Sequence, residues 1–386
     1  MTIGRATSVK DALNQTISYA YDSYRRLQRV TQPEGDYAEL TYDGRGNVTQ
    51  TLYVPKAGSG LSNLTTTASF PASCSNPVIC NKPTATTDAR GAVTDYVWNG
   101  THGGLESVTL PAPTPGAVRP QTRIAYAAQT AYYKDSSGAI VAAPTAVTLP
   151  VSISQCATGA APACVGTTDE VRQTIQYGSA GVANNLLPTV VTQGDGAGAL
   201  TASTSLTYTV NGDVASADGP LPGSDDTTFY RYDAARQRIG VVGPDPDGAS
   251  GPLLRRAQRS TYDAAGRLTL SEQGTVAGLT DSDWSNFSSL QQTAVAYDAY
   301  GRPTHQRVQA GGTTHSLVQI SYDASGRQDC VATRMNPSTF ANPPSSACSL
   351  DTAGAFGPDR ITKYNYDAAG RVTSTVSGYG SGSEIT

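Results

Sequence analysis

The sequence predicts an all-β protein made of repeated antiparallel β-hairpins, and three observations support that fold class. Glycine and proline supply 39 and 23 of the 386 residues, and charged residues make up only 15%, against about 25% in typical soluble domains. Long helices rich in charged residues are therefore not expected. Tyrosine, which favours strands, accounts for 21 residues, and the dipeptide Tyr-Asp occurs seven times.

The Tyr-Asp dipeptides belong to a longer repeat. The two clearest copies begin at Tyr262 and Tyr366 and read Tyr-Asp-Ala-Ala-Gly-Arg, followed by an apolar residue and threonine. Arg25 and Arg236 take the place of the glycine in two other copies, and the copy at Asp88 lacks the tyrosine. The predicted structural residues of the repeat are Tyr21, Asp22, Tyr42, Asp43, Gly46, Asp88, Gly91, Tyr232, Asp233, Tyr262, Asp263, Gly266, Arg267, Tyr297, Asp298, Gly301, Arg302, Tyr322, Asp323, Gly326, Arg327, Tyr366, Asp367, Gly370 and Arg371.

The repeat has the properties of a hairpin tip. In a three-residue loop, a type I turn leads into a left-handed position that glycine occupies without a Cβ clash, and Gly266 falls at that position. Asp263 begins the turn and can accept hydrogen bonds from its backbone N–H groups. Arg267 then lies opposite Asp263 as an oppositely charged cross-strand pair. Tyr262 points to the other face, with Leu268 as its direct or diagonal partner.

The repeat organises most of the chain. We expect a single repeat region over residues 1–386, with clear units in 1–100 and 206–375 and an irregular, insertion-rich stretch in 101–205. Segment 281–290 favours one short helix. About 25–30 strands at roughly 4.8 Å each would form a ribbon on the order of 130 Å wide. A twisted ribbon of that width has to curl.

The recurring pattern Tyr-Asp-x-x-Gly-Arg, apolar residue, threonine resembles the Rhs/YD-repeat family, which includes bacterial Rhs toxins, shell components of insecticidal toxin complexes and the teneurins. The resemblance extends from about Tyr21 to Thr373. It implies a long antiparallel sheet wound as a spiral into part of a hollow YD-repeat shell, which in this family encloses a C-terminal toxin. The family's aspartyl protease signature has no match in the right context here. We therefore expect neither protease nor toxin in this chain, which resembles a fragment of a shell.

Six cysteines fall into three close pairs, each placed by the sequence in a segment that interrupts the repeat. Their even number and tight pairing favour local disulfides that staple the insertions. Zinc is the competing interpretation, but the chain has no Cys-x-x-Cys motif and only three histidines. Disulfides imply an oxidising destination for the parent protein. The expected pairs are Cys74 with Cys80, Cys156 with Cys164, and Cys330 with Cys348.

No chemical site emerges from the remaining polar residues. A serine or cysteine nucleophile needs an oriented histidine, yet His102, His305 and His315 are isolated in the sequence, although the last two flank a turn predicted at 311–312 and could face each other. Acidic residues within 225–247 lack the ligand spacing of a Ca²⁺ loop. The sequence therefore predicts no catalytic residue, no metal site and no cofactor.

Charge and hydropathy limit the partners. The net charge of −4 gives no electrostatic footprint for nucleic acid, and no stretch approaches the 18 apolar residues of a membrane span. We expect a non-catalytic piece of shell around a C-terminal toxin or effector that is not in this chain. The parent would be secreted or at the cell surface, although the chain has no signal peptide. Its expected partners are the remaining repeats, the enclosed toxin and, further, cell-surface glycans. The alternative is an extracellular adhesion or carbohydrate-binding module.

Overall fold

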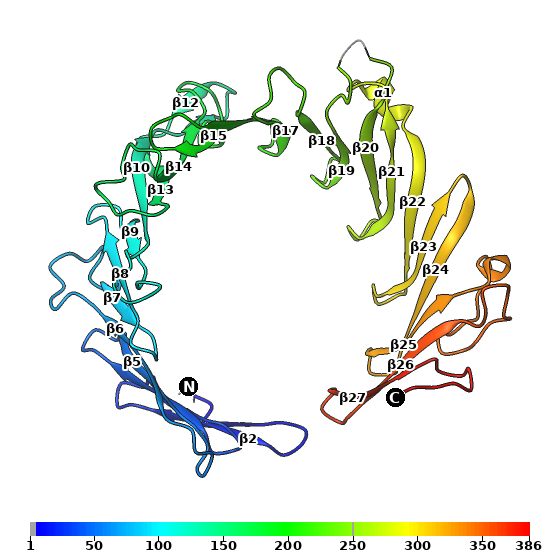
Figure 1. The fold of residues 1–386 in the computed structure, drawn as a ribbon, viewed down its shortest axis with the longest axis horizontal. Coiled ribbons are helices and arrows are strands. Elements are labelled where there is room, and N and C mark those ends of the chain that lie inside the picture. The colour runs from blue at the N-terminus through cyan, green and yellow to red at the C-terminus, as the bar shows by residue number, and fades with distance from the viewer. Residues whose placement is uncertain (1–4, 249–250) are drawn as a thin grey trace. The chain divides into compact units, whose positions relative to one another are not determined.

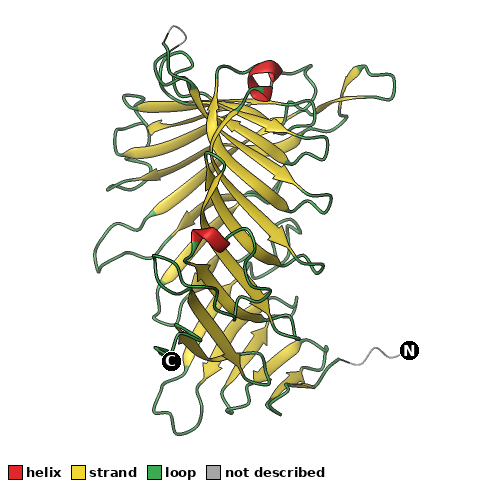
Figure 2. Cartoon of the chain, turned by 90° about the vertical axis from the view of Figure 1, so that its right-hand side faces the viewer, coloured by secondary structure: helices red, strands yellow, loops and turns green. Residues whose placement is uncertain are grey.

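The computed structural model describes residues 5–248 and 251–386. Within these residues nearly all regular structure is strand (Figure 2). One antiparallel sheet contains 25 strands and does not close, and β11 (Tyr132–Lys134) and β12 (Ile140–Ala142) form a separate hairpin. The predicted all-β fold with a long antiparallel hairpin sheet is confirmed.

The chain divides into two compact units, Met1–Ser205 and Leu206–Thr386. In each unit by itself, the strands of the sheet follow one another in chain order, and consecutive strands are turned relative to one another so that the sheet is curved (Figure 1). The strands of the first unit are β1 (Ser8–Lys10), β2 (Thr16–Tyr21), β3 (Leu27–Thr31), β4 (Tyr37–Tyr42), β5 (Val48–Val54), β6 (Leu64–Ser69), β7 (Ala85–Thr87), β8 (Val93–Trp98), β9 (Leu105–Thr109), β10 (Gln121–Gln129), β13 (Val147–Cys156), β14 (Glu170–Tyr177) and β15 (Pro188–Asp195), besides β11 and β12.

The strand β16 (Thr201–Tyr208) contains the boundary between the units. The strands of the second unit are β17 (Val214–Asp218), β18 (Thr228–Tyr232), β19 (Arg238–Val242), β20 (Arg255–Tyr262), β21 (Leu268–Val276), β22 (Ser288–Tyr297), β23 (Pro303–Ala310), β24 (Thr313–Tyr322), β25 (Gln328–Arg334), β26 (Arg360–Tyr366) and β27 (Val372–Ser377). The second unit also contains the helix α1 (Asp281–Ser285) and the 3-10 turn η1 (Pro337–Thr339).

The helix expected over 281–290 forms only over Asp281–Ser285. A capping box starts it, because the Thr280 hydroxyl accepts from the Asp283 N–H and the Asp283 carboxylate accepts in return. Strand β22 begins at Ser288 and ends the helical segment. The helix places Trp284 over Gly240, where a Cβ atom would lie 2.6 Å from the ring.

The two clusters of buried apolar residues are small and lie where insertions cover the sheet of the second unit. One cluster contains Val242, Ala257, Val276 and Phe287, with Trp284 of α1 packed against it. The other lies beneath the loop between β25 and β26 and contains Cys330, Ala332, Ala347 and Ile361. Most other strand residues are only half-buried, as expected for a one-layer sheet.

The hairpin tips adopt the predicted backbone. Gly266 has φ of 78° and lies in the left-handed region. Arg25 and Arg236, which replace the glycine, have φ of 66° and 64°. The hairpin geometry thus imposes this conformation even where the side chain disfavours it.

Candidate functional site

The best-formed feature of the chain is the hairpin tip. At Asp263, one carboxylate oxygen accepts from the N–H groups of Ala265 and Arg267 at 2.9 and 3.0 Å, and the other accepts from Arg267 Nε at 2.7 Å. The Gly266 N–H closes the turn on the Asp263 carbonyl at 2.9 Å. The aspartate and arginine therefore lock the turn, as the cross-strand pairing predicts. The same aspartate–arginine contact recurs at Asp22, Asp298, Asp323 and Asp367.

These carboxylates are held in their charged form. The hydrogen bond from the Arg267 side chain, followed by that from its backbone N–H, lowers the pKa of Asp263. At Asp367 the Arg371 backbone N–H, followed by its side chain, lowers the pKa in the same way. A carboxylate with a lowered pKa and no spare oxygen is suited to holding a turn rather than to carrying a proton.

The repeat tyrosines connect one hairpin to the preceding one. A register shift beside Tyr262 places it directly opposite Leu268, which settles the alternative left open by the sequence. The Tyr262 hydroxyl donates to the Arg238 carbonyl at 3.1 Å. Equivalent bonds from Tyr297 and Tyr322 reach the carbonyls of the preceding hairpins at 2.8 and 2.9 Å.

The repeat arginines act in the same direction along the sheet. Arg267 binds Asp263 of its own hairpin and lies 4.7 Å from the centre of the Tyr297 ring in the next one. The pairs Arg26–Tyr42, Arg302–Tyr322 and Arg327–Tyr366 have the same contact, at 4.4, 4.3 and 4.5 Å. We call this series of aspartate–arginine–tyrosine contacts the hairpin-tip ladder. Sequence reasoning found its residues but missed the contact between arginine and the next tyrosine.

Three further aromatic residues make the same kind of bond to a preceding strand without the rest of the repeat unit. Tyr126 and Tyr177 lie at register shifts and donate to backbone carbonyls of preceding strands at 3.1 and 2.7 Å. Trp98 makes the equivalent bond through its ring N–H, to the Pro83 carbonyl at 2.7 Å. None of the three is followed by aspartate, so the dipeptide search could not find them.

The incomplete copies find other partners. Asp43 binds the Asn47 amide at 2.8 Å in place of arginine. Arg236, displaced into the glycine position, leaves its own hairpin and binds Asp213 with contacts of 2.7 and 3.0 Å. Asp88 caps its turn through the N–H groups of Arg90 and Ala92 at 2.9 Å, and its carboxylate lies 3.7 Å from Arg90 Nε. The contacts of Arg236 and of Asp88 therefore each hold a turn without the link from arginine to the next tyrosine.

The structure joins the cysteines as the sequence predicts: Cys74 with Cys80, Cys156 with Cys164, and Cys330 with Cys348. Their placement differs in part from the expectation that all six lie in interrupting segments. Cys156 is the last residue of β13, and Cys330 lies within β25 with no exposed surface. The Cys330–Cys348 bridge therefore fastens an insertion directly to the sheet, because a strand side chain points out of the sheet plane toward the loop that covers it.

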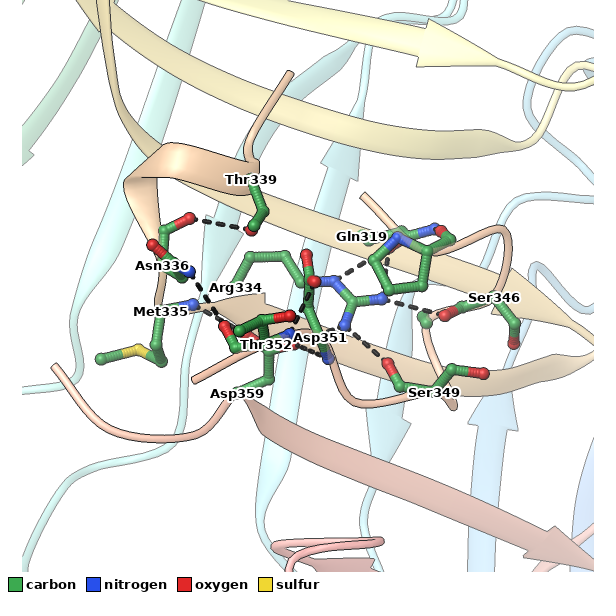
Figure 3. A network of polar contacts seen from close by, with 12 residues as sticks. Gln319, Arg334, Met335, Asn336, Thr339, Ser346, Ser349, Asp351, Thr352 and Asp359 are labelled. Carbon is green, nitrogen blue, oxygen red and sulfur yellow. Dashed lines mark hydrogen bonds and ion pairs between the residues drawn. The ribbon is translucent and has the colours of Figure 1, made fainter. Parts of the chain in front are cut away.

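A buried ion pair holds the same insertion (Figure 3). The side chains of Arg334 and Asp359 are 1% and 2% exposed, and Arg334 Nη1 lies 2.6 Å from Asp359 Oδ2. Gln319 accepts from Arg334 Nε at 3.0 Å, and the carbonyls of Ser346 and Ser349 accept from its Nη atoms at 2.9 and 2.7 Å. The sequence carries no repeat signal for this network.

Burial alone would raise the pKa of Asp359. The hydrogen bond from the Met335 N–H, followed by that from the Arg334 side chain, outweighs burial and lowers the pKa. The pair is therefore ionised inside the protein. The Arg334 guanidinium binds both the backbone carbonyls within the loop between β25 and β26 and the Asp359 carboxylate at its end.

The three histidines lie apart. His305 lies opposite Gln319 rather than His315, so the two histidines do not face each other across the strands. Ala310 pairs with Thr313 across the turn, so His305 lies five residues from that pair and His315 only two. His102 instead packs against Tyr126, with ring centres 4.7 Å apart.

Two groups among the described residues bring together three potential metal ligands: Cys156, Cys164 and Asp169, and Asp329, Cys330 and Cys348. In each group both sulfur atoms are bonded to each other in a disulfide. A disulfide sulfur is not the thiolate that metals bind. Among the acidic residues weighed for Ca²⁺, Asp226 binds the N–H groups of Gly219 and Leu221.

Comparison with known proteins gives a match in the N-terminal part of the chain. Residues 2–37 match the family model described as RHS Repeat. This match, over the first Tyr-Asp hairpin, confirms the resemblance predicted from the sequence. A comparison with curated proteins gives no match.

Among solved structures, this chain is similar to one titled TcdB2-TccC3-Cdc42, at 13% identity and a TM-score of 0.43, covering 95% of this chain and 22% of that one. A second, TcdB2-TccC3-TEV, has 14% identity and a TM-score of 0.42 with the same coverage. The Photorhabdus luminescens Tc holotoxin pore has 12% identity and a TM-score of 0.20, covering 94% and 26%. The chain thus spans 22–26% of the length of these three structures.

In the part of the chain that the structure describes, no helix has the length and apolar character needed to cross a bilayer.

Proposed function

We propose that this chain is a non-catalytic stretch of β-shell that walls off a toxin or effector not contained in it. The hairpin-tip ladder carries the proposal. The charged and aromatic residues that recur in the sequence are engaged in holding one hairpin to the next, as for Arg267 between Asp263 and Tyr297. A long sheet whose polar residues hold its own hairpins together is suited to forming a wall around another polypeptide. The RHS Repeat match at residues 2–37 supports the same function.

The disulfides support a further part of the proposal, namely that the parent protein is exported. Disulfides persist in oxidising compartments and are rare in the cytosol. All six cysteines are paired here. The parent protein would therefore act in a secreted or surface-exposed form, with the remaining repeats and the enclosed toxin as its partners.

The proposal is tested on the native protein that carries this chain, isolated from its source cells. Limited proteolysis followed by mass spectrometry should leave a polypeptide from outside residues 1–386 intact. The same protein unfolded in denaturant before proteolysis should lose that polypeptide. If no polypeptide outside the repeats is protected, the shell proposal is wrong.

A variant tests whether the ladder maintains the wall. Arg267→Gln removes both the Asp263 ion pair and the contact with Tyr297, and protection of the enclosed segment should fall. Ser325→Ala is the matched control, because Ser325 contributes only its backbone N–H to a hairpin tip. If the enclosed segment is equally protected from protease in the two variants, the ladder does not maintain the enclosure.

A further inference from the structure

Two of the three disulfides are alike in burial but have opposite charges beside them. Cys156–Cys164 joins a half-buried cysteine to one that is 4% exposed. Cys330–Cys348 joins a half-buried cysteine to one with no exposed surface. A reductant in solution therefore reaches one sulfur atom of each bridge to a similar extent, and a difference in reactivity is expected from the groups around the sulfur atoms.

Arg123 on β10 faces the Cys156–Cys164 bridge. Its Nη1 atom donates to Cys156 Sγ at 3.6 Å and to Cys164 Sγ at 3.8 Å. Among the described residues Nη1 has no other acceptor. The Nη2 atom holds the guanidinium in this position, because it donates to Ser154 Oγ at 2.9 Å and to Glu170 Oε1 at 3.0 Å. Arg123 thus presents a fixed N–H group to both sulfur atoms.

Two carboxylates lie near the same bridge, and both are engaged. Glu170 accepts from Arg123 through Oε1 and from a backbone N–H through Oε2 at 2.8 Å. One oxygen of Asp169 lies within 4.8 Å of both sulfur atoms. This carboxylate opposes a negative charge on sulfur, but it accepts three hydrogen bonds, from the Thr158 N–H and hydroxyl and from the Gly159 N–H. The donor in direct contact with the sulfur atoms is therefore Arg123.

The Cys330–Cys348 bridge has a neighbour of the opposite sign. Asp329 Oδ2 lies 3.2 Å from Cys348 Sγ. Lys363 Nζ donates to the other oxygen, Oδ1, at 2.7 Å, so the oxygen beside the sulfur atom carries negative charge. The second sulfur atom, that of Cys330, lies in a buried apolar cluster. Neither sulfur atom of this bridge has a cationic donor among the described residues.

We propose that Cys156–Cys164 is a site of thiol–disulfide exchange, opened by a small thiol or a dithiol reductant, and that Cys330–Cys348 is a closed structural bridge. The thiolate of the reductant attacks Cys156 Sγ, the half-buried sulfur atom, and forms a mixed disulfide as the bond to Cys164 Sγ breaks. Cys164 leaves as a thiolate. A second thiolate of the reductant then attacks the mixed disulfide, which releases Cys156 as a thiolate and the reductant as its own disulfide.

The exchange is balanced by the reductant. Two electrons pass from its two thiols to the protein, and the two protons of those thiols go to solvent or to the released cysteine thiolates. No further oxidant or reductant takes part. The inference goes beyond the shell proposal, because a wall does not need a reactive bond.

Arg123 accelerates the first step. Exchange is faster when the leaving sulfur atom is stabilised as a thiolate, and a hydrogen bond from a guanidinium stabilises that charge. Nη1 is already beside Cys164 Sγ, so no side chain has to move as the bond breaks. In the other bridge the half-buried sulfur atom is the one beside Asp329, and this carboxylate repels an incoming thiolate.

The test follows each bridge separately in the folded 386-residue chain. The protein is treated with limiting dithiothreitol at neutral pH, samples are quenched with iodoacetamide, and peptide mass spectrometry gives a rate of opening for each bridge. We expect Cys156–Cys164 to open about tenfold faster than Cys330–Cys348. The exposed Cys74, bonded to Cys80, provides an internal standard, because no charged side chain donates to that bridge among the described residues.

A double variant removes the donor. Arg123→Met with Glu170→Gln leaves no unpaired buried carboxylate, and it should slow the opening of Cys156–Cys164 several-fold relative to the internal standard. Glu170→Gln alone keeps the donor and should not slow it. Arg172→Met is the matched control, because Arg172 lies on the adjoining strand β14 but donates to neither sulfur atom in the described part of the chain.

Asp329→Asn provides an independent variant at the other bridge. The amide oxygen can still accept from Lys363 but carries no charge, so the opening of Cys330–Cys348 should become several-fold faster. Selective opening of Cys156–Cys164 that is slowed in the double variant supports the proposal. Equal rates at the two bridges, or opening of Cys156–Cys164 that is equally fast in the double variant and in the matched control, would overturn it.

Discussion

At the scale of single residues, the backbone of the hairpin tip decides which side chains are tolerated. The tip after Tyr42 contains two glycines in different conformations. Gly46 has φ of 92°, whereas Gly44 is outside the left-handed region and a Cβ atom there would meet nothing within 4 Å. The two positions therefore separate backbone strain from the simple presence of a side chain.

We expect Gly46→Ala to lower the local stability of the hairpin 37–54 by about 1–2 kcal/mol, the cost of a left-handed L-residue. Gly44→Ala should leave it unchanged or raise it by up to about 1 kcal/mol, by restricting the unfolded chain. Hydrogen exchange of the hairpin amides measures both, since a repeat array does not unfold in one step. Equal protection in both variants would contradict the assignment of a special glycine position.

The converse change should stabilise the chain. Arg25 occupies the left-handed position with φ of 66°, so Arg25→Gly should raise local stability by about 1 kcal/mol. Arg236→Gly relieves the same strain but removes the bidentate contact with Asp213, and its gain should be smaller. Hydrogen exchange in the two hairpins distinguishes them, and a larger gain at Arg236 would show that strain does not govern the position.

A histidine gives the chain a pH response in the mildly acidic range. Burial, followed by the charges of Arg307 and Arg334, lowers the pKa of His305. The unfolded chain takes up a proton below about pH 6.5, whereas the folded chain does so only at lower pH. The stability that His305 contributes is thus complete above about pH 6.5 and is lost as the pH falls through the folded pKa.

We expect His305→Gln to reduce the drop in thermal unfolding temperature between pH 7.5 and pH 5.0. The tip aspartates contribute little to this interval, because the lowered pKa of a residue such as Asp263 moves its loss of stability below about pH 3.9. Identical pH profiles for the wild type and the variant would show that His305 titrates as freely in the folded chain as in the unfolded one.

At the scale of elements, the insertion over 335–359 is held to the sheet by a disulfide and by a buried ion pair. The Cys330–Cys348 bridge closes a loop over a sequence separation of 18 residues, for which about 3 kcal/mol is typical. Removing one partner of a buried ion pair costs about 3–5 kcal/mol, because the other charge stays buried. The Arg334–Asp359 pair should therefore matter at least as much as the disulfide.

We predict that Arg334→Met exposes the amides of 335–359 to exchange more than the double change Cys330→Ala with Cys348→Ala. Adding Asp359→Asn to Arg334→Met should restore part of the protection, since no unpaired charge then remains. Strands β20 to β24 should keep their protection in every variant. If removing the disulfide has the larger effect, the bridge and not the ion pair holds the insertion.

The elements also show which features a sequence can reveal. The tip at Asp263 was predictable because its turn, glycine and arginine lie within five consecutive residues. The Arg334–Asp359 pair was not, because its partners are 25 residues apart in an insertion without a repeat. Tyr126 was missed because only the tyrosine of the unit remains there. His305 and His315 do not face each other because His305 lies five residues before Ala310 and His315 only two after Thr313, and Ala310 and Thr313 are the pair that closes the turn.

At the scale of the whole molecule, stability is distributed along the chain rather than concentrated in one core. In the described ranges, each strand of the long sheet pairs with its neighbours in chain order, and only the β11–β12 hairpin is bypassed, by the pairing of β10 with β13. Repeat arrays of this kind are stabilised by contacts between adjacent units. The ladder between hairpins such as Asp263–Arg267 and Tyr297 supplies those contacts.

An open array of strands leaves edges that can pair with another copy. Within the described residues, β1 pairs only with β2, and Val9 at its centre is 52% exposed. We therefore expect this 386-residue chain to associate reversibly, with a weight-average mass that rises with concentration in analytical ultracentrifugation. Val9→Lys should reduce that association, because a charge on an edge strand opposes pairing.

Val97→Lys adds the same charge at a residue that is also 52% exposed, but on β8, which is paired on both sides. It should leave association unchanged. A concentration-independent monomer, or an equal effect of the two lysines, would mean that the edge of β1 is not the surface through which copies meet.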